Sequence, residues 1–191
     1  ERIAENPFVE QYFITESANM DSETIEPAEI TSSGGGFQRA FSSFTFSGSN
    51  QPSNLDFVLG NVKLASGRTL TADDLKNGSK VVIISEEVAA QNNLIVGDII
   101  SLYRAQTSPT MPGAGRQDNT PSAAAPAADY EVVGIYTAVL DGFSVNTLFT
   151  SNTVINELTN TLGTDETSGS VVFILDSPDH VETFKDQASA Y

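Results

Sequence analysis

Residues 80–103, KVVIISEEVAAQNNLIVGDIISLY, decide the fold. The four consecutive apolar residues 81–84 predict a strand that is covered on both faces. Ser85 can cap the following helix, and two glutamates stand in its first turn, where the positive end of the helix dipole favours acids. A turn and a second strand complete the stretch, and a third strand at residues 130–136, YEVVGIY, is predicted to pair with it. No side chain in this stretch is a candidate catalytic residue, so the stretch indicates the fold and not a chemical function.

The charge of the chain excludes one class of partner. Its 191 residues include 9 Lys plus Arg against 25 Asp plus Glu, which gives a formal charge of -16. Such a surface repels nucleic acid phosphates and anionic lipid headgroups, so no nucleic acid partner is expected. The chain has no cysteine, which excludes disulfides, thiolate zinc sites and thiol nucleophiles.

The ends of the chain look cut. No apolar run approaches the roughly 18 residues of a membrane-spanning helix, and the N-terminus lacks the pattern of a signal peptide. Residues 1–6, ERIAEN, resemble the tail of a helix, and the last helix reaches Tyr191 without a stop signal. We therefore expect a soluble piece whose first and last helices pack side by side at its membrane-proximal end.

The remaining elements can be predicted along the chain. Pro7 should end a leading helix and residues 8–15 should form a strand, whereas residues 17–54 are a long polar connection. Residues 55–64 are predicted to be a strand pair or a strand broken at Gly60. Thr71 should cap a helix, with Asp74 completing a capping box. Ser151 should cap another helix, which ends at Gly163 and turns four apolar residues inward: Val154, Ile155, Leu158 and Leu162. A buried strand is predicted at 170–175, and Ser177-Pro178-Asp179 should start a last helix with Val181, Phe184 and Ala188 inward.

Few side chains are candidates for a binding site. Phe37, Phe41 and Phe44 have helical spacing, whereas Phe44 and Phe46 have strand spacing, so the stretch is ambiguous between the two. It is predicted to cover the core, and the alternative is a partner-contact patch made of Phe37, Phe41 and Phe44. The glycines at 34–36 lack the Lys and Ser or Thr of a phosphate-binding loop and are predicted to be a flexible connection.

The polar residues of interest are predicted to have structural roles and not catalytic ones. Asp73 and Asp74 are helix-start charges, Asp98 belongs to a turn, and the only histidine, His180, lies in an exposed first turn. A hydrolase based on carboxylates such as Asp141 and Asp176 would need a defined separation within a cleft, which the sequence does not give. We therefore predict no catalytic residue, no cofactor and no metal site.

Five motifs follow one another in a set order: Gly67-Arg68, Thr71-Ala72-Asp73-Asp74, VVIISEE at 81–87, LIVGDI at 94–99 and YEVVGIY at 130–136. In this order they resemble the extracytoplasmic (MacB-type periplasmic core) domain of FtsX/MacB-family ABC transporter permeases. The similarity covers residues 55–191 well and the first fifteen residues loosely.

The resemblance implies an α+β fold with two lobes. Residues 1–54 and 137–191 would form a porter-like α+β lobe from both chain ends. Residues 55–136 would form a mainly β, sabre-like lobe from the middle. The low-complexity stretch 104–129 is a hairpin insertion in that lobe, rich in Pro, Ala, Ser and Thr. Deletion of residues 106–127 is expected to leave the fold intact.

The resemblance also implies a function without an active site. The domain would lie on the extracytoplasmic face of the cell membrane, either extracellular on a Gram-positive cell or periplasmic. It would couple ATP hydrolysis by a cytoplasmic ATPase subunit, reached through transmembrane helices, to export of a peptide or drug or to an extracytoplasmic partner. A second permease subunit is a further expected partner. The alternative is a stand-alone cell-surface ligand-binding or adhesion module.

Overall fold

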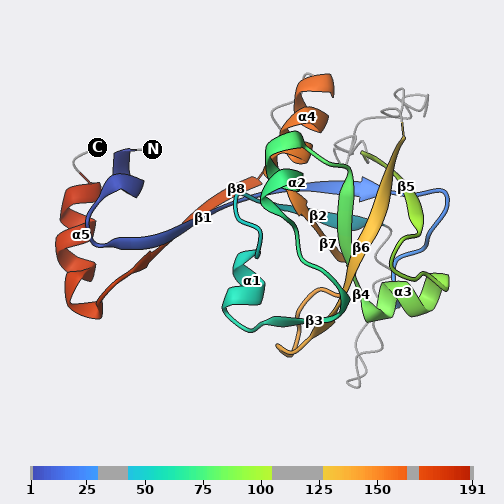
Figure 1. Ribbon diagram of the computed structural model, residues 1–191, viewed down its shortest axis with the longest axis horizontal. Helices are drawn as coiled ribbons and strands as arrows, with labels where there is room; N and C mark the ends of the chain where they lie inside the picture. Colours follow the sequence, from blue (N-terminus) through green and yellow to red (C-terminus); the bar gives the residue numbers. More distant parts are fainter. Residues whose placement is uncertain (1, 30–42, 105–126, 163–167, 190–191) are drawn as a thin grey trace, which may run out of the picture.

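The computed structural model of the protein describes residues 2–29, 43–104, 127–162 and 168–189 (Figure 1). The fold is α+β, as predicted. The elements in chain order are the 3-10 helix η1 (Arg2–Glu5), β1 (Val9–Asp21), β2 (Phe44–Ser49), α1 (Leu55–Val58), β3 (Val62–Gly67), α2 (Ala72–Asn77), β4 (Val81–Ser85), α3 (Glu86–Asn92), β5 (Ile99–Arg104), β6 (Ala128–Ala138), β7 (Thr147–Ser151), α4 (Asn152–Leu162), β8 (Ser168–Leu175), the 3-10 helix η2 (Pro178–His180) and α5 (Val181–Ala188).

Six strands form a ring. The sheet runs in the order β2-β7-β4-β6-β5-β1-β8, and β1 also pairs with β2. This additional pairing closes the sheet into a ring. One edge of β1 pairs with β2, and at the opposite edge the last two residues of β1, Met20 and Asp21, pair with β5. β3 and β8 lie outside the ring, where β3 pairs with β6 and β8 pairs with β1. Closure leaves the six ring strands with few open edges.

The inner face of the ring holds the larger core. Successive side chains of a strand point to opposite faces, so alternate residues of the ring strands face inward. They form one cluster with contributions from all six strands: Met20, Phe44, Phe46, Val82, Ile84, Ile100, Leu102, Tyr130, Val132 and Leu148. Val88 of α3 and two residues of α4, Val154 and Ile155, belong to the same cluster. The inward stripe predicted for α4 is therefore confirmed for these two residues.

A second core covers the outer face. Val81 and Ile83 of β4 pack there with Val133 and Phe149, and Phe57 of α1 and Leu75 of α2 pack against them. β4 is therefore buried on both faces, as its apolar run predicts, and it pairs in parallel with β6.

The helix after β4 begins as predicted. The Ser85 side chain accepts a hydrogen bond from the Val88 N–H at 3.0 Å, which caps α3. Asn93 ends α3 in the left-handed conformation with φ 54.

The strands β1 and β8 form a two-stranded ribbon that leaves the ring and carries η1 and α5 at its far end (Figure 1). The two ends of the chain lie side by side there, and the Asn6 side-chain amide donates to the Gln187 side-chain oxygen at 2.6 Å. The prediction that the first and last helices are neighbours is confirmed. Their position relative to a membrane stays a prediction.

Several predicted elements were wrong in detail. Residues 55–64 contain the short helix α1 and the start of β3, because Asn54 caps a helical turn with a hydrogen bond from the Asp56 N–H. The leading helix is a single 3-10 turn, and β1 continues to Asp21, well into the stretch that was predicted to be a polar connection. Strand pairing with β2 and β5 overrides the polar composition of that stretch.

β8 is a strand as predicted, but it is not buried. Val171 and Val172 are 53% and 37% exposed. The apolar composition of SVVFIL suggested burial on two faces, whereas the strand lies in a ribbon that projects from the ring and has β1 on one edge only (Figure 1).

The predicted lobes share one sheet. β4 comes from the middle of the chain and lies between β7 and β6, and β6 itself crosses the predicted boundary at residue 136. The division into porter-like and sabre-like lobes stays a prediction, and most of the insertion at 104–129 lies outside the described residues.

The two glycines that flank β3 should differ in their tolerance of a side chain: Gly60 precedes the strand and Gly67 is its last residue. Gly60 and Gly67 both have φ +76, but a Cβ added at Gly67 would lie 2.3 Å from the Val133 carbonyl oxygen, whereas one added at Gly60 meets nothing within 4 Å. Gly60→Ala should lower the free energy of unfolding by about 1 kcal/mol, the cost of the left-handed conformation. Gly67→Ala should cost about 2 kcal/mol more because the backbone must shift. Urea denaturation measures the free energy of unfolding of both variants. Equal losses would contradict the close approach of Gly67 in β3 to the Val133 carbonyl in β6.

Candidate functional site

Of the three phenylalanines of the predicted contact patch, the structure describes Phe44. Phe44 lies in β2 with 1% of its surface exposed and belongs to the inner core, so its ring packs inside the fold. Phe37 and Phe41 lie outside the described residues, and their role in partner contact stays a prediction.

The acids singled out in the sequence are dispersed. Asp98 accepts a hydrogen bond from the Ile95 N–H at 2.8 Å, which is the predicted turn role. Asp141 is exposed in the turn after β6, whereas Asp176 lies at the far end of the ribbon. Within the described parts of the chain, no three or more His, Asp or Glu side chains are grouped so that they could hold a metal ion.

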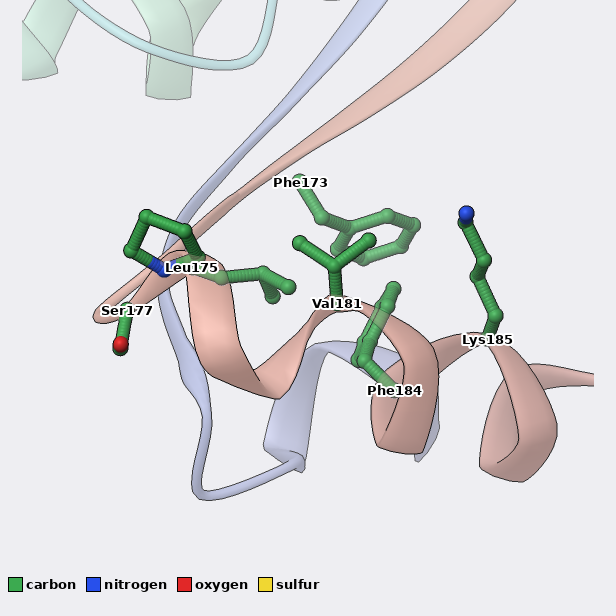
Figure 2. Close-up of a pocket in the computed structure, with 7 residues that line it drawn as sticks. Phe173, Leu175, Ser177, Val181, Phe184 and Lys185 are labelled. Carbon is green, nitrogen blue, oxygen red and sulfur yellow. The ribbon is translucent and has the colours of Figure 1, made fainter.

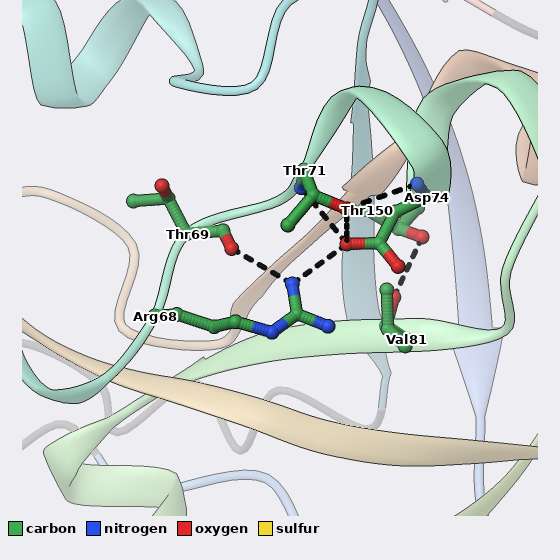
Figure 3. A network of polar contacts seen from close by, with 6 residues as sticks. All are labelled: Arg68, Thr69, Thr71, Asp74, Val81 and Thr150. Atoms are coloured by element: carbon green, nitrogen blue, oxygen red, sulfur yellow. Dashed lines mark hydrogen bonds and ion pairs between the residues drawn. The ribbon is translucent and has the colours of Figure 1, made fainter.

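One buried carboxylate organises a polar network between β3 and α2 (Figure 3). Asp74 Oδ2 accepts hydrogen bonds from the Thr71 N–H at 2.8 Å, from the Thr71 hydroxyl at 2.7 Å and from Arg68 Nη1 at 2.6 Å. The Thr71 hydroxyl in turn accepts from the Asp74 N–H at 3.1 Å, which completes the predicted capping box. The network fixes the start of α2 to the turn that follows β3.

The surroundings of Asp74 favour its charged form. Burial alone would raise the pKa of Asp74, but the hydrogen bonds from Arg68 and Thr71 and the positive charge of Arg68 lower this pKa below its usual 3.8. Close by, the Thr150 hydroxyl donates to the Val81 carbonyl at 2.9 Å and ties β7 to β4 (Figure 3). These contacts stabilise the fold.

An open apolar groove lies at the far end of the ribbon. The terminal groove is the space between β8 and α5 with a cavity volume of about 490 Å³, and it is lined by Phe173, Leu175, Pro178, Val181, Phe184 and Lys185. Figure 2 shows the side chains of Phe173 and Leu175 pointing from β8 toward Val181 and Phe184 of α5. The rings of Phe173 and Phe184 are 5.3 Å apart. The side of α5 that was predicted to face inward therefore packs on β8, only partly covered.

His180 holds the two ends of the chain together. Its ring is stacked on the ring of Phe8 with 4.1 Å between centroids, and its Nδ1 is 2.8 Å from Asp176 Oδ1. The Asp176 N–H donates to the Phe8 carbonyl at 3.0 Å. The hydrogen bond with His180 lowers the pKa of Asp176 below its usual range. His180 is thus a structural residue of the terminal contact.

The base of the ribbon is clamped to the ring by three amide side chains. Asn50 Oδ1 accepts from the Ile14 N–H at 2.7 Å, and the Ile14 carbonyl accepts from Asn152 Nδ2 at 2.9 Å. Gln51 Nε2 donates to the Tyr12 carbonyl at 3.2 Å. We call Asn50, Gln51 and Asn152 the ribbon clamp. No periodicity or motif in the sequence predicts it, because the partners are far apart along the chain.

Comparison with protein families identifies the chain. The model of the MacB-like periplasmic core domain matches residues 6–191. The chain belongs to this family. It is accordingly an extracytoplasmic domain of an ABC transporter permease, and the predicted localisation is confirmed. A comparison with curated protein sequences gave no match.

Two crystal structures share the fold of this MacB-like domain. The periplasmic region of MacB from Actinobacillus actinomycetemcomitans matches with a TM-score of 0.58 and 14% identity, over 99% of this chain and 70% of that one. The extracellular domain of the noncanonic ABC-type transporter YknZ from Gram-positive bacteria matches with a TM-score of 0.56 and 20% identity, over 96% of this chain and 74% of that one. No helix in the described ranges is long and apolar enough to cross a membrane.

The Asp74 network predicts a dependence of stability on acid. Asp74→Ala removes three accepted hydrogen bonds and should lower the free energy of unfolding by about 2 to 3 kcal/mol at pH 7. Because the folded-state pKa of Asp74 is lowered, its contribution is complete above the unfolded pKa and is lost as the pH falls through the folded one. The difference between wild type and variant should therefore shrink as the pH drops below 3.8.

The adjacent Asp73 provides the control for this prediction. It is exposed in the same first turn of α2, so Asp73→Ala should change the free energy of unfolding by less than about 1 kcal/mol. Denaturant titrations of both variants from pH 7 to pH 3 measure the effect. A difference for Asp74→Ala that stays constant over this range would contradict the account.

Proposed function

We propose that this domain transmits movement between the membrane-embedded part of its permease and the extracytoplasmic side. In this way it couples ATP hydrolysis by a cytoplasmic subunit to export of a peptide or drug, or to action on an extracytoplasmic partner. The family supports this proposal, and so do the names of the two similar structures, which come from the ABC transporters MacB and YknZ. The domain contributes shape and stiffness to the cycle and performs no reaction of its own. A second permease subunit is a proposed partner in the assembly.

The observation that carries the proposal is the path from the chain ends to the ring. The ends meet through the Phe8–His180 stack and the Asn6–Gln187 hydrogen bond. From there β1 runs without a break into the ring, where it pairs with β2 and β5. The ribbon clamp fixes the point of entry. A displacement of the terminal helices would therefore be passed to the ring as a movement of the whole ribbon.

The ribbon clamp offers a direct test in the full-length permease with its ATPase, reconstituted in lipid vesicles. A fluorescent label attached at Gln91→Cys, an exposed position on α3, reports movement of the ring when ATP is added on the cytoplasmic side. The double variant Asn50→Ala with Gln51→Ala should reduce this ATP-dependent signal at least about fivefold, because the ribbon is no longer fixed to the ring. ATP hydrolysis should stay near the wild-type rate.

Asn77→Ala is the matched control, since it removes an exposed amide on α2 far from the ribbon along the chain. It should leave both the signal and the hydrolysis rate unchanged. The absence of an ATP-dependent signal in the wild type, or a clamp variant that signals like wild type, would contradict the proposal.

A further inference from the structure

β8 has an edge that is unusually suited to bind another strand. Among the described strands, β8 pairs only with β1. None of its eight residues, SGSVVFIL, is charged or proline. Edge strands are normally protected by charges, proline or short length. β3, which likewise pairs with a single described strand, carries the exposed Lys63 within six residues.

The hydrogen-bonding pattern fixes which backbone groups of β8 face outward. The polar backbone groups of Tyr12 and Ile14 that bind the ribbon clamp point away from β8. Their partners across the ribbon are Phe173 and Val171. In an antiparallel pair, opposite residues either exchange both hydrogen bonds or both point away from each other. The N–H and C=O groups of Val171 and Phe173 therefore point to the free edge.

The terminal groove lies beside this edge. Phe173 and Leu175 line it from the strand, and Val181 and Phe184 line it from α5 (Figure 2). Val171 shares their face of β8, because the residues alternate, and it is 53% exposed. A strand added along β8 would have backbone partners at the edge and apolar contacts for alternate side chains. This combination is how strand addition obtains both affinity and specificity.

The charge around the groove selects the kind of occupant. Residues 2–13 and 173–189 carry six acidic and two basic side chains, a formal charge of -4 with His180 neutral. One of the two bases, Lys185, is already paired with Glu182 at 2.8 Å. A second copy of this acidic chain would be repelled, whereas a basic segment would be attracted.

We propose that the free edge of β8 and the terminal groove form a docking site for an extended, basic and apolar segment of an extracytoplasmic partner protein. The segment adds to the ribbon as a third strand beside β8. It places apolar side chains on the face of Val171 and Phe173 and its basic side chains toward the acids around the groove. This site does not depend on the coupling function proposed above.

The test uses the 191-residue chain and a synthetic probe. The probe is an eight-residue peptide of alternating valine and lysine, blocked at both ends. Hydrogen exchange of single amides is read by NMR with and without the peptide. The amides of Val171 and Phe173 should exchange at least about tenfold more slowly with peptide bound. Those of Ser170 and Val172 should change little, because they already donate to β1.

Three variants separate the contribution of the edge from that of the groove. Val171→Pro removes an outward N–H and leaves the ladder with β1 intact, so it should weaken peptide binding at least about tenfold. Val171→Thr keeps that N–H and a similar shape, and should bind like wild type. Phe184→Ala keeps the edge but removes part of the groove, so it should weaken binding severalfold without changing the exchange pattern. If Val171→Pro fails to fold, hydrogen exchange of the Val171 and Phe173 amides in the wild type still tests the proposal.

Three results would overturn the proposal. The first is saturating peptide that leaves the amides of Val171 and Phe173 unprotected. The second is equal binding of a control peptide with glutamate in place of lysine. The third is protection of both amides without peptide in a dimeric chain, which would assign the edge to a second copy.

Discussion

Strand β1 is hydrogen-bonded along both of its edges, and the rest of the structure depends on this double pairing. Its 13 residues span roughly 40 Å. The first part pairs with β8 to make the ribbon, and the last part pairs with β2 and β5 to close the ring. The same strand therefore joins the chain ends to the core. Without it the ring would be open and the terminal helices would have no fixed relation to the remainder of the fold.

The distribution of apolar surface follows from this arrangement. The ring has an inner face filled by side chains from six strands and an outer face covered by β3, α1 and α2. In the ribbon, Phe13 of β1 is buried, and Phe173 of β8 packs on Phe184 of α5. Exposed apolar side chains occur on the ribbon, at Val171 and Val172, and also elsewhere, for example at Leu59, Ile95 and Ile99.

The sequence predicted the parts whose signals are local. The apolar run of β4, the Ser85 cap, the Thr71–Asp74 capping box and the Ser177-Pro178 start all appear as expected. Ring closure, the exposure of β8 and the ribbon clamp could not be predicted, because each depends on contacts between distant residues, such as Asn152 with Ile14. The polar residues 16–21 looked like a connection for the same reason. Their strand conformation comes from neighbours on both sides rather than from propensity.

The central claim is that the chain ends and the ring move as one body. The chain has no cysteine, so spin labels can be attached uniquely at Thr183→Cys on α5 and Gln91→Cys on α3, both exposed positions. Pulsed electron paramagnetic resonance then gives the distribution of distances between the two labels. The account predicts a single narrow distribution. A broad distribution, or one with two separated maxima, would contradict it, because the ribbon would then bend independently of the ring.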